Sequence, residues 1–247
     1  MHCPPAIELN SSATTRADSA AVRFHGLRAA LASVALLVAC VGDPPPHEAA
    51  LHDGQAELAM GNAGLALAQF ELAHQIGPAV PEVLAGLAVA NLELDQPATA
   101  LEWFDRLEEV APHALDTELT GKRCDALERA LEEQIRAFEW ASAVELAEQT
   151  PAAAVCKSES LSERSIRAHL GAAGQAREGG DHDEAVHHLE WVLAERPGHP
   201  DATLASLGWL LQDGQRKAAL RLLSEALAQH PKDDRLIEAM VELLESR

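Results

Sequence analysis

The chain contains no tyrosine, and phenylalanine and tryptophan together supply only 3% of its 247 residues. No aromatic platform on which bases or sugar rings could stack is therefore evident. Basic residues are also few: 19 lysines and arginines stand against 39 acidic residues, for a formal net charge of −20. This balance argues against nucleic acid or an anionic membrane surface as the main partner and favours a soluble body or a basic partner.

Motifs that carry chemistry are missing as well. The sequence has no HExxH, no GxSxG and no phosphate-binding loop, and none of its four cysteines forms a CxxC pair. A cluster of His182, Asp183, His187 and His188 suggests a metal, but no two of these histidines stand four residues apart on one helical face. We therefore expect an exposed polar face rather than a metal site, and we predict no cofactor and no enzymatic activity.

Near the N-terminus, Arg23 and Arg28 precede an apolar run, Ala29–Ala39, that is interrupted only by a serine. Since a bilayer-spanning helix needs about 20 apolar residues, the run is too short to cross a membrane, but it suits the core of a signal peptide. An uncleaved signal anchor and a short buried helix are the alternatives. Because a signal that extends from Met1 to Ala39 would be long, we also expect that translation begins near Val22.

The run ends in Leu37-Val38-Ala39-Cys40, which resembles the lipobox of bacterial lipoproteins. The resemblance implies a signal peptide over residues 1–39, acylation of Cys40, and a membrane anchor in the bacterial cell envelope, at the outer membrane or facing the periplasm. Residues 40–47 then form a proline-rich linker that separates the body from the bilayer.

What the sequence has in abundance is alanine, leucine and glutamate, which favours an all-helical fold. It also has an internal repeat. One set of residues, Gly180, Ala185, Leu189 and Pro197, recurs 34 positions later as Gly214, Ala219, Leu223 and Pro231. Upstream, Ala66, Phe70 and Pro78 recur in the same way as Ala100, Phe104 and Pro112. Each residue recurs at the same interval, and a fixed period of about 34 residues indicates stacked helical hairpins.

These units resemble tetratricopeptide repeats. The resemblance implies an all-α, right-handed superhelical solenoid of helix-turn-helix repeats. We expect repeats 1–3 over residues 48–150, a joint at 151–160, repeats 4–5 over 161–231 and a capping helix at 232–247. In that helix Leu236, Ile237, Met240, Leu243 and Leu244 should cover the last repeat.

The third unit is irregular, with helices expected at Glu118–Phe138 and Trp140–Gln149. Antiparallel helices that turn near Phe138 would bring Cys124 close to Cys156. A disulfide is expected there, with two buried free thiols as the alternative. Two capping serine or aspartate residues are expected to start the later helices: Ser160, with Glu163 three residues on, and Asp181, with Glu184.

In the family that the repeats resemble, the first helix of each repeat (helix A) lines a concave groove. Applied to this chain, the resemblance places a peptide-binding groove at Leu51, Gln55, Leu58, Ala85, Val89, Leu92, Arg167, Leu170, Gly174, Arg177, Leu204, Gly208 and Leu211. These residues are largely apolar with two arginines, which suits an amphipathic helix or an extended peptide. For each residue taken alone, packing against a neighbouring helix is the alternative, and the four tryptophans are interpreted as packing residues.

The sequence therefore predicts a membrane-anchored interaction scaffold with a protein or peptide partner and no nucleic acid. Similar lipoproteins serve in outer-membrane, pilus or secretion-complex assembly. The alternative is an accessory or regulatory repeat domain for a cell-wall enzyme.

Overall fold

The computed structural model describes residues 46–245, so the expected signal peptide, Cys40 and most of the linker lie outside the described residues. Within this range every regular element is a helix. The helices are α2 (Pro46–Ala59), α3 (Ala63–Ile76), α4 (Pro81–Glu93), α5 (Pro97–Val110), the short 3₁₀ helix η1 (Pro112–Ala114), α6 (Thr117–Arg136), α7 (Trp140–Gln149), α8 (Pro151–Val155), α9 (Glu159–Gly179), α10 (His182–Glu195), α11 (Pro200–Gln212), α12 (Arg216–Gln229) and α13 (Asp234–Glu245). None of these helices is long and apolar enough to cross a membrane.

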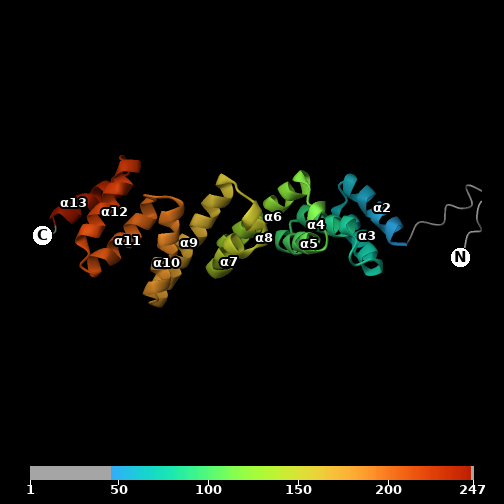
Figure 1. Ribbon diagram of the computed structural model, residues 1–247, viewed down its shortest axis with the longest axis horizontal. Helices are drawn as coiled ribbons and strands as arrows, with labels where there is room; N and C mark the ends of the chain where they lie inside the picture. Colours follow the sequence, from blue (N-terminus) through green and yellow to red (C-terminus); the bar gives the residue numbers. More distant parts are fainter. Residues whose placement is uncertain (1–45, 246–247) are drawn as a thin grey trace, which may run out of the picture. The chain divides into compact units, whose positions relative to one another are not determined.

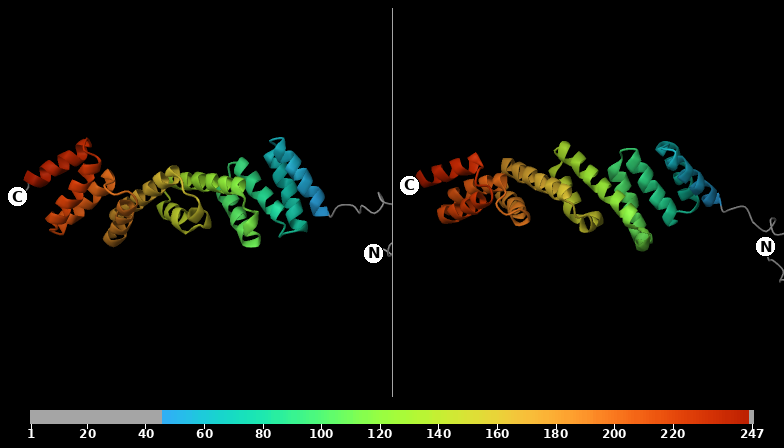
Figure 2. Two further views of the ribbon diagram at one scale, coloured as in Figure 1. Left: turned by 45° about the horizontal axis from the view of Figure 1, so that its top comes forward. Right: turned by 90° about the horizontal axis from the view of Figure 1, so that it is seen from above.

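The helices pair as hairpins that follow one another along the chain (Figure 1). α2 packs on α3, α4 on α5, α9 on α10 and α11 on α12, and each hairpin contacts the next (Figure 2). The all-helical repeat fold predicted from the repeat period is confirmed. Helices α2, α4, α5, α8 and α11 begin with proline, which costs nothing at a first helical position, because its missing N–H would have no partner there.

The alanines and large apolar residues that recur at this period are buried between helices, whereas the recurring glycines and prolines are exposed at turns and helix ends. Phe70 on α3 is completely buried, and its ring lies over Gly54 of α2 and Gly86 of α4. A Cβ atom at Gly54 would come within 2.7 Å of that ring, and one at Gly86 within 2.5 Å. Phe70, the large residue on the second helix of its hairpin (helix B), therefore requires glycine at these two positions of the neighbouring first helices.

Each hairpin turn contains one residue in the left-handed conformation. In three turns it is glycine: Gly61, Gly180 and Gly214, with φ of 80°, 81° and 69°. In the other two it is Asp95, with φ of 58°, and Phe138, with φ of 62°. Gly61 and Asp95 stand one repeat period apart, as do Gly180 and Gly214, so the turn keeps its geometry where the sequence does not keep its glycine.

The third unit differs from expectation in two ways. The short helix α8 occupies the segment predicted as a joint and packs on α6 and α7. The prediction that Ser160 caps the next helix is wrong, because the cap is Ser158, whose Oγ accepts a hydrogen bond from the Leu161 amide at 3.0 Å. Ser158 also donates to Glu128 of α6 at 2.6 Å, which fixes the chain there and starts α9 earlier than predicted. The Asp181 cap is confirmed, since its side chain accepts from the Glu184 amide.

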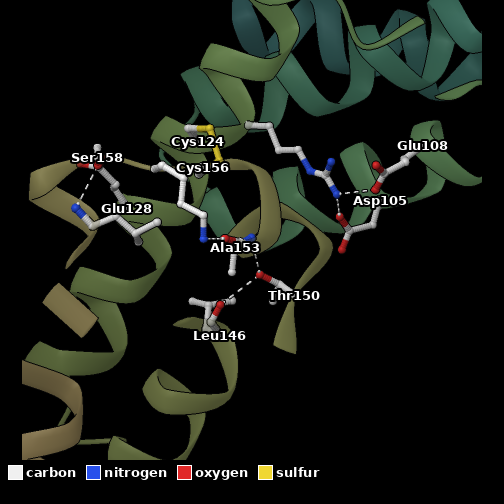
Figure 3. The surroundings of a disulfide bond; sticks show 12 residues. Asp105, Glu108, Cys124, Glu128, Leu146, Thr150, Ala153, Cys156 and Ser158 are labelled. Carbon is white, nitrogen blue, oxygen red and sulfur yellow. Dashed lines mark hydrogen bonds and ion pairs between the residues drawn. A yellow bond between two sulfur atoms is a disulfide. The ribbon is translucent and has the colours of Figure 1, made fainter. Parts of the chain in front are cut away.

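Two adjacent residues of α6 tie this irregular unit to its neighbours (Figure 3). Cys124 forms a disulfide with Cys156, which follows α8. Arg123 is 2% exposed, and its Nη2 donates to Asp105 Oδ1 at 2.6 Å and to Glu108 Oε2 at 2.8 Å, both on α5. α6 is therefore joined covalently to the end of α8 on one side and through a buried arginine to α5 on the other.

The last helix also departs from the prediction. Leu236 and Leu243 of α13 are buried and Met240 is partly buried, but Ile237 and Leu244 are exposed. The expectation that all five apolar residues cover the last repeat is wrong for these two, because the helix turns them away from α11 and α12.

Replacing Cys124 and Cys156 with serine should lower the free energy of unfolding by about 3–4 kcal/mol, since the disulfide closes an interval of 32 residues. Urea denaturation checks this, with reduced wild-type chain as the reference, because reduction should destabilise the wild type and leave the double variant unchanged. In a Cys3→Ser, Cys40→Ser chain, thiol labelling after denaturation should find no free thiol. Two labelled thiols would contradict the disulfide.

Candidate binding groove

One face of α9 forms the floor of a groove, here called the C-terminal groove. Its cavity measures about 490 Å³. The walls come from α6 and α7 on one side and from α10 and α11 on the other. The lining residues are Ile135, Trp140, Arg167, Leu170, Gly171, Ala173, Gly174, Arg177, Leu189, Asp201, Ala205 and Trp209.

The predicted groove residues divide between this cavity and other positions. Arg167, Leu170, Gly174 and Arg177 all line the C-terminal groove. Leu204 instead packs against the core formed by α11, α12 and α13, and neither Leu211 nor Gly208 borders the cavity, although both are exposed.

The charges of the C-terminal groove are unevenly neutralised. Arg167 is paired with Glu132 of α6, and Asp201 accepts from Arg235 of α13 at 2.6 Å. Burial would raise the pKa of Glu132, but the hydrogen bond from Arg167 and the surrounding guanidinium charges lower it below its ordinary value. Arg177 is exposed and makes no ion pair within residues 46–245. An unpaired guanidinium therefore stands at one end of the apolar floor.

A second cavity of about 560 Å³ lies on the first helices of the N-terminal hairpins. Gln55, Leu58 and Val89 line it, together with Leu119 and Lys122 of α6. The other predicted positions do not: Leu51 and Ala85 are partly buried away from the cavity, and Leu92 is 3% exposed within the core. For Leu92 the alternative of packing against neighbouring helices is the correct one.

A third cavity, of about 480 Å³, lies between α10, α11 and α12 and was not predicted. Its polar wall includes His182, Asp183 and His187. The ring of His182 lies edge-on to that of Trp209, with the two ring centroids 5.0 Å apart. Trp209 borders both this cavity and the C-terminal groove, so it does more than pack between repeats. No group of histidine, cysteine and acidic side chains within residues 46–245 could hold a metal ion.

The expectation of an exposed histidine face is wrong for His188, which is buried against His169 of α9. Their Nδ1 atoms lie 3.1 Å apart, so one ring donates a hydrogen and the other accepts it. The His169 ring is fully buried, stacks on Trp191 with centroids 3.8 Å apart, and has its Nε2 3.4 Å from Glu148 Oε1 of α7. Burial, with the charges of His188 and His187, lowers the pKa of His169 to about 4. The sequence offers no signal for this pair, because neither spacing nor motif links positions on two different helices.

Residues 176–244, from the end of α9 into α13, match the family model of the tetratricopeptide repeat. No curated protein matches the chain significantly. Three solved structures align with the chain. A thermophilic tetratricopeptide repeat protein of Thermus thermophilus is 25% identical over 80% of this chain and 98% of its own, with a TM-score of 0.33, and PilF of Pseudomonas aeruginosa is 15% identical over 80% of this chain and 82% of its own, with a TM-score of 0.34. YrrB, described as a tetratricopeptide repeat protein with an unusual peptide-binding site, is 15% identical over 77% of this chain and 89% of its own, with a TM-score of 0.36.

The His169–His188 pair predicts a loss of stability in mild acid. An unfolded histidine has a pKa near 6.5, whereas that of folded His169 is about 4, so the unfolded state binds the proton first as the pH falls. The stability that neutral His169 contributes is complete above pH 6.5 and is lost as the pH falls towards 4. Between pH 7.5 and 5.0 the loss from this group should be about 2 kcal/mol.

Urea unfolding at the two pH values measures this loss, and a His169→Gln variant separates it from the titration of carboxylates. The variant should be less stable at pH 7.5, and its stability should change less with pH. Equal pH dependence in the two proteins would show that His169 does not titrate in this way.

Proposed function

We propose that this chain, which carries tetratricopeptide repeats over residues 176–244, is an interaction scaffold that binds an acidic, amphipathic peptide or helix in its C-terminal groove. Tetratricopeptide repeats bind protein or peptide partners. The observation that carries the proposal is the apolar floor of α9 with the unpaired Arg177 at its edge.

The groove suits a ligand with apolar residues on one side and a carboxylate at one end. Leu170 and Ala173 lie between Arg167 and Arg177, which are ten residues apart and so about 15 Å apart along α9. Burying one leucine-sized side chain contributes about 1.5–3 kcal/mol. A carboxylate on Arg177 adds a charge-assisted hydrogen bond and sets the direction of the ligand. Because the walls are packed helices, little ordering entropy opposes binding.

The second part of the proposal is that Cys40 is acylated and holds the repeats at a bacterial envelope membrane, outside the cytoplasm. The lipobox-like Leu37-Val38-Ala39-Cys40 supports it. Several acyl chains, as bacterial lipoproteins carry, give a lasting anchor. Cys40 is six residues before Pro46, so the first hairpin would stay within about 20 Å of the bilayer. Such a tether fits a role in assembling an envelope complex, such as an outer-membrane, pilus or secretion complex.

A Cys40→Ser chain should move from the membrane fraction to the soluble fraction of bacterial cells, because the acyl chains would have no attachment site. Fractionation with immunodetection measures the change, and mass spectrometry of the wild type should find a lipid-modified N-terminal Cys40. A Cys3→Ser chain is the matched control and should stay with the membrane. Membrane retention of the Cys40→Ser chain would contradict the anchor.

For the groove, a photoreactive residue at position 174 should crosslink the partner in cells. Nothing lies within 4 Å of the Cβ position there, so the substitution should not disturb the fold. Adding Arg177→Glu should reduce the crosslink at least tenfold, because the ligand carboxylate would then face a like charge. Arg221→Glu is the matched control, since Arg221 is also exposed but lies on α12 outside the groove. An unchanged crosslink in the Arg177→Glu chain would refute the groove.

A further inference from the structure

α13 is built like the first helix of a further hairpin, and one of its faces is not covered. Counting one repeat period back from Ile237, Val241 and Leu244 gives Thr203, Leu207 and Leu210 of α11. Thr203 is 0% and Leu207 7% exposed, whereas Ile237 is 41%, Val241 48% and Leu244 59% exposed. The repeat positions of Thr203 and Leu207 are therefore buried in α11 and open in α13.

The covering of these positions in α11 comes from the helices that follow. Leu207 packs in one cluster with Ala219 and Leu223 of α12 and with Leu236 of α13. In α4 the corresponding positions, Leu84 and Ala88, are fully buried in the same way. α13 is the last helix of the described array, and no described helix occupies the place that α12 takes beside α11 (Figure 1, Figure 2).

The open face of α13 has an acidic edge. At 100° per residue, Ile237, Val241 and Leu244 form one stripe, and exposed Glu238, Glu242 and Glu245 follow it on the side away from α12. None of these three carboxylates has an ion-pair partner among the described residues. The face is thus an apolar stripe bounded by unpaired negative charge.

We propose that this stripe is a docking surface for an amphipathic helix of a partner protein, which takes the place of a helix B and carries basic residues along one edge. The second helices of this chain show what apolar pattern fits. In α12 the packing residues are Ala219, Leu223 and Ala226, and in α10 they are Ala185, Leu189 and Val192, all completely or almost completely buried. The partner helix carries a small residue, a large apolar residue four positions later and an apolar residue three further on.

A second copy of the chain is a poorer occupant. Each copy carries a formal charge of −20, and an α13 that packs on another α13 in the antiparallel sense brings the same row of glutamates together. Like charges that meet across an interface oppose association. A basic edge on the partner instead pairs with Glu238, Glu242 and Glu245.

The probe for this surface is a synthetic peptide with the α12 sequence, residues 216–229, which has the required apolar pattern and three basic residues against one acidic residue. Fluorescence anisotropy of the labelled peptide with the full chain should show saturable binding, weakened when NaCl is raised from 50 to 300 mM. Val241→Glu should weaken binding at least tenfold, as should Glu238→Lys combined with Glu242→Lys. A peptide with Leu223→Glu should not bind.

Leu72→Glu on α3 is the matched control, because Leu72 is 48% exposed, as Val241 is, but lies far along the chain from α13. That variant should bind the peptide as the wild type does, as should Arg177→Glu, which separates this surface from the C-terminal groove. Circular dichroism should show unchanged helix content in every variant. Absence of peptide binding to the wild type, equal binding to the Val241→Glu chain, or a wild-type dimer that Val241→Glu dissociates would each overturn the proposal.

Discussion

The packing of one large ring against two glycines determines how the first two hairpins of the array fit together. Phe70 can reach the middle of its hairpin only because Gly54 and Gly86 present bare backbone to it from both sides. A methyl group at either glycine would overlap the ring, and the two first helices would have to separate. Because each hairpin contacts mainly its neighbours, its stability comes from its own contacts and from those two interfaces, as in other repeat arrays. The two glycines therefore set the spacing of α2, α3 and α4.

The same kind of contact reappears where the repeat period breaks. Trp140 of α7 lies against Gly171 of α9, where no Cβ could be accommodated without movement. This contact joins the irregular third unit to the fourth, and the buried Arg123 and the Cys124–Cys156 disulfide join it to the second unit and to α8. The irregular unit is thus held by one covalent bond, one buried ion-pair cluster and one ring-on-glycine contact. It can lose the period without losing its place in the array.

The repeat period was enough to predict the hairpins, because it marks which residues face inward. It was not enough to predict what depends on contacts between helices. His169 and His188 are 19 residues apart, and only the packing of α9 on α10 brings their rings together. Ser158 and Ser160 both suit a helix cap, and the choice between them depends on Glu128, which is 30 residues away from Ser158. The groove shows the same division: Leu170 and Arg177 line it, while Leu92, with the same periodic position as Arg177, is buried by neighbours that the period does not identify.

α13 shows why inward-facing residues need not be buried. The sequence places Ile237 and Val241 at positions that pack in α11, but burial at such a position requires the next helix as well as the residue itself. The terminal helix of a repeat array has a face with the same apolar residues that pack between internal repeats. A polar outer face normally replaces those residues at the end of the array. In α13 that polar outer face is present only in part, as the row of glutamates beside the stripe. The two surfaces therefore have different origins: the C-terminal groove is a cavity on α9 with walls from the helices of neighbouring units, and the stripe on α13 is a packing face that the described helices leave uncovered.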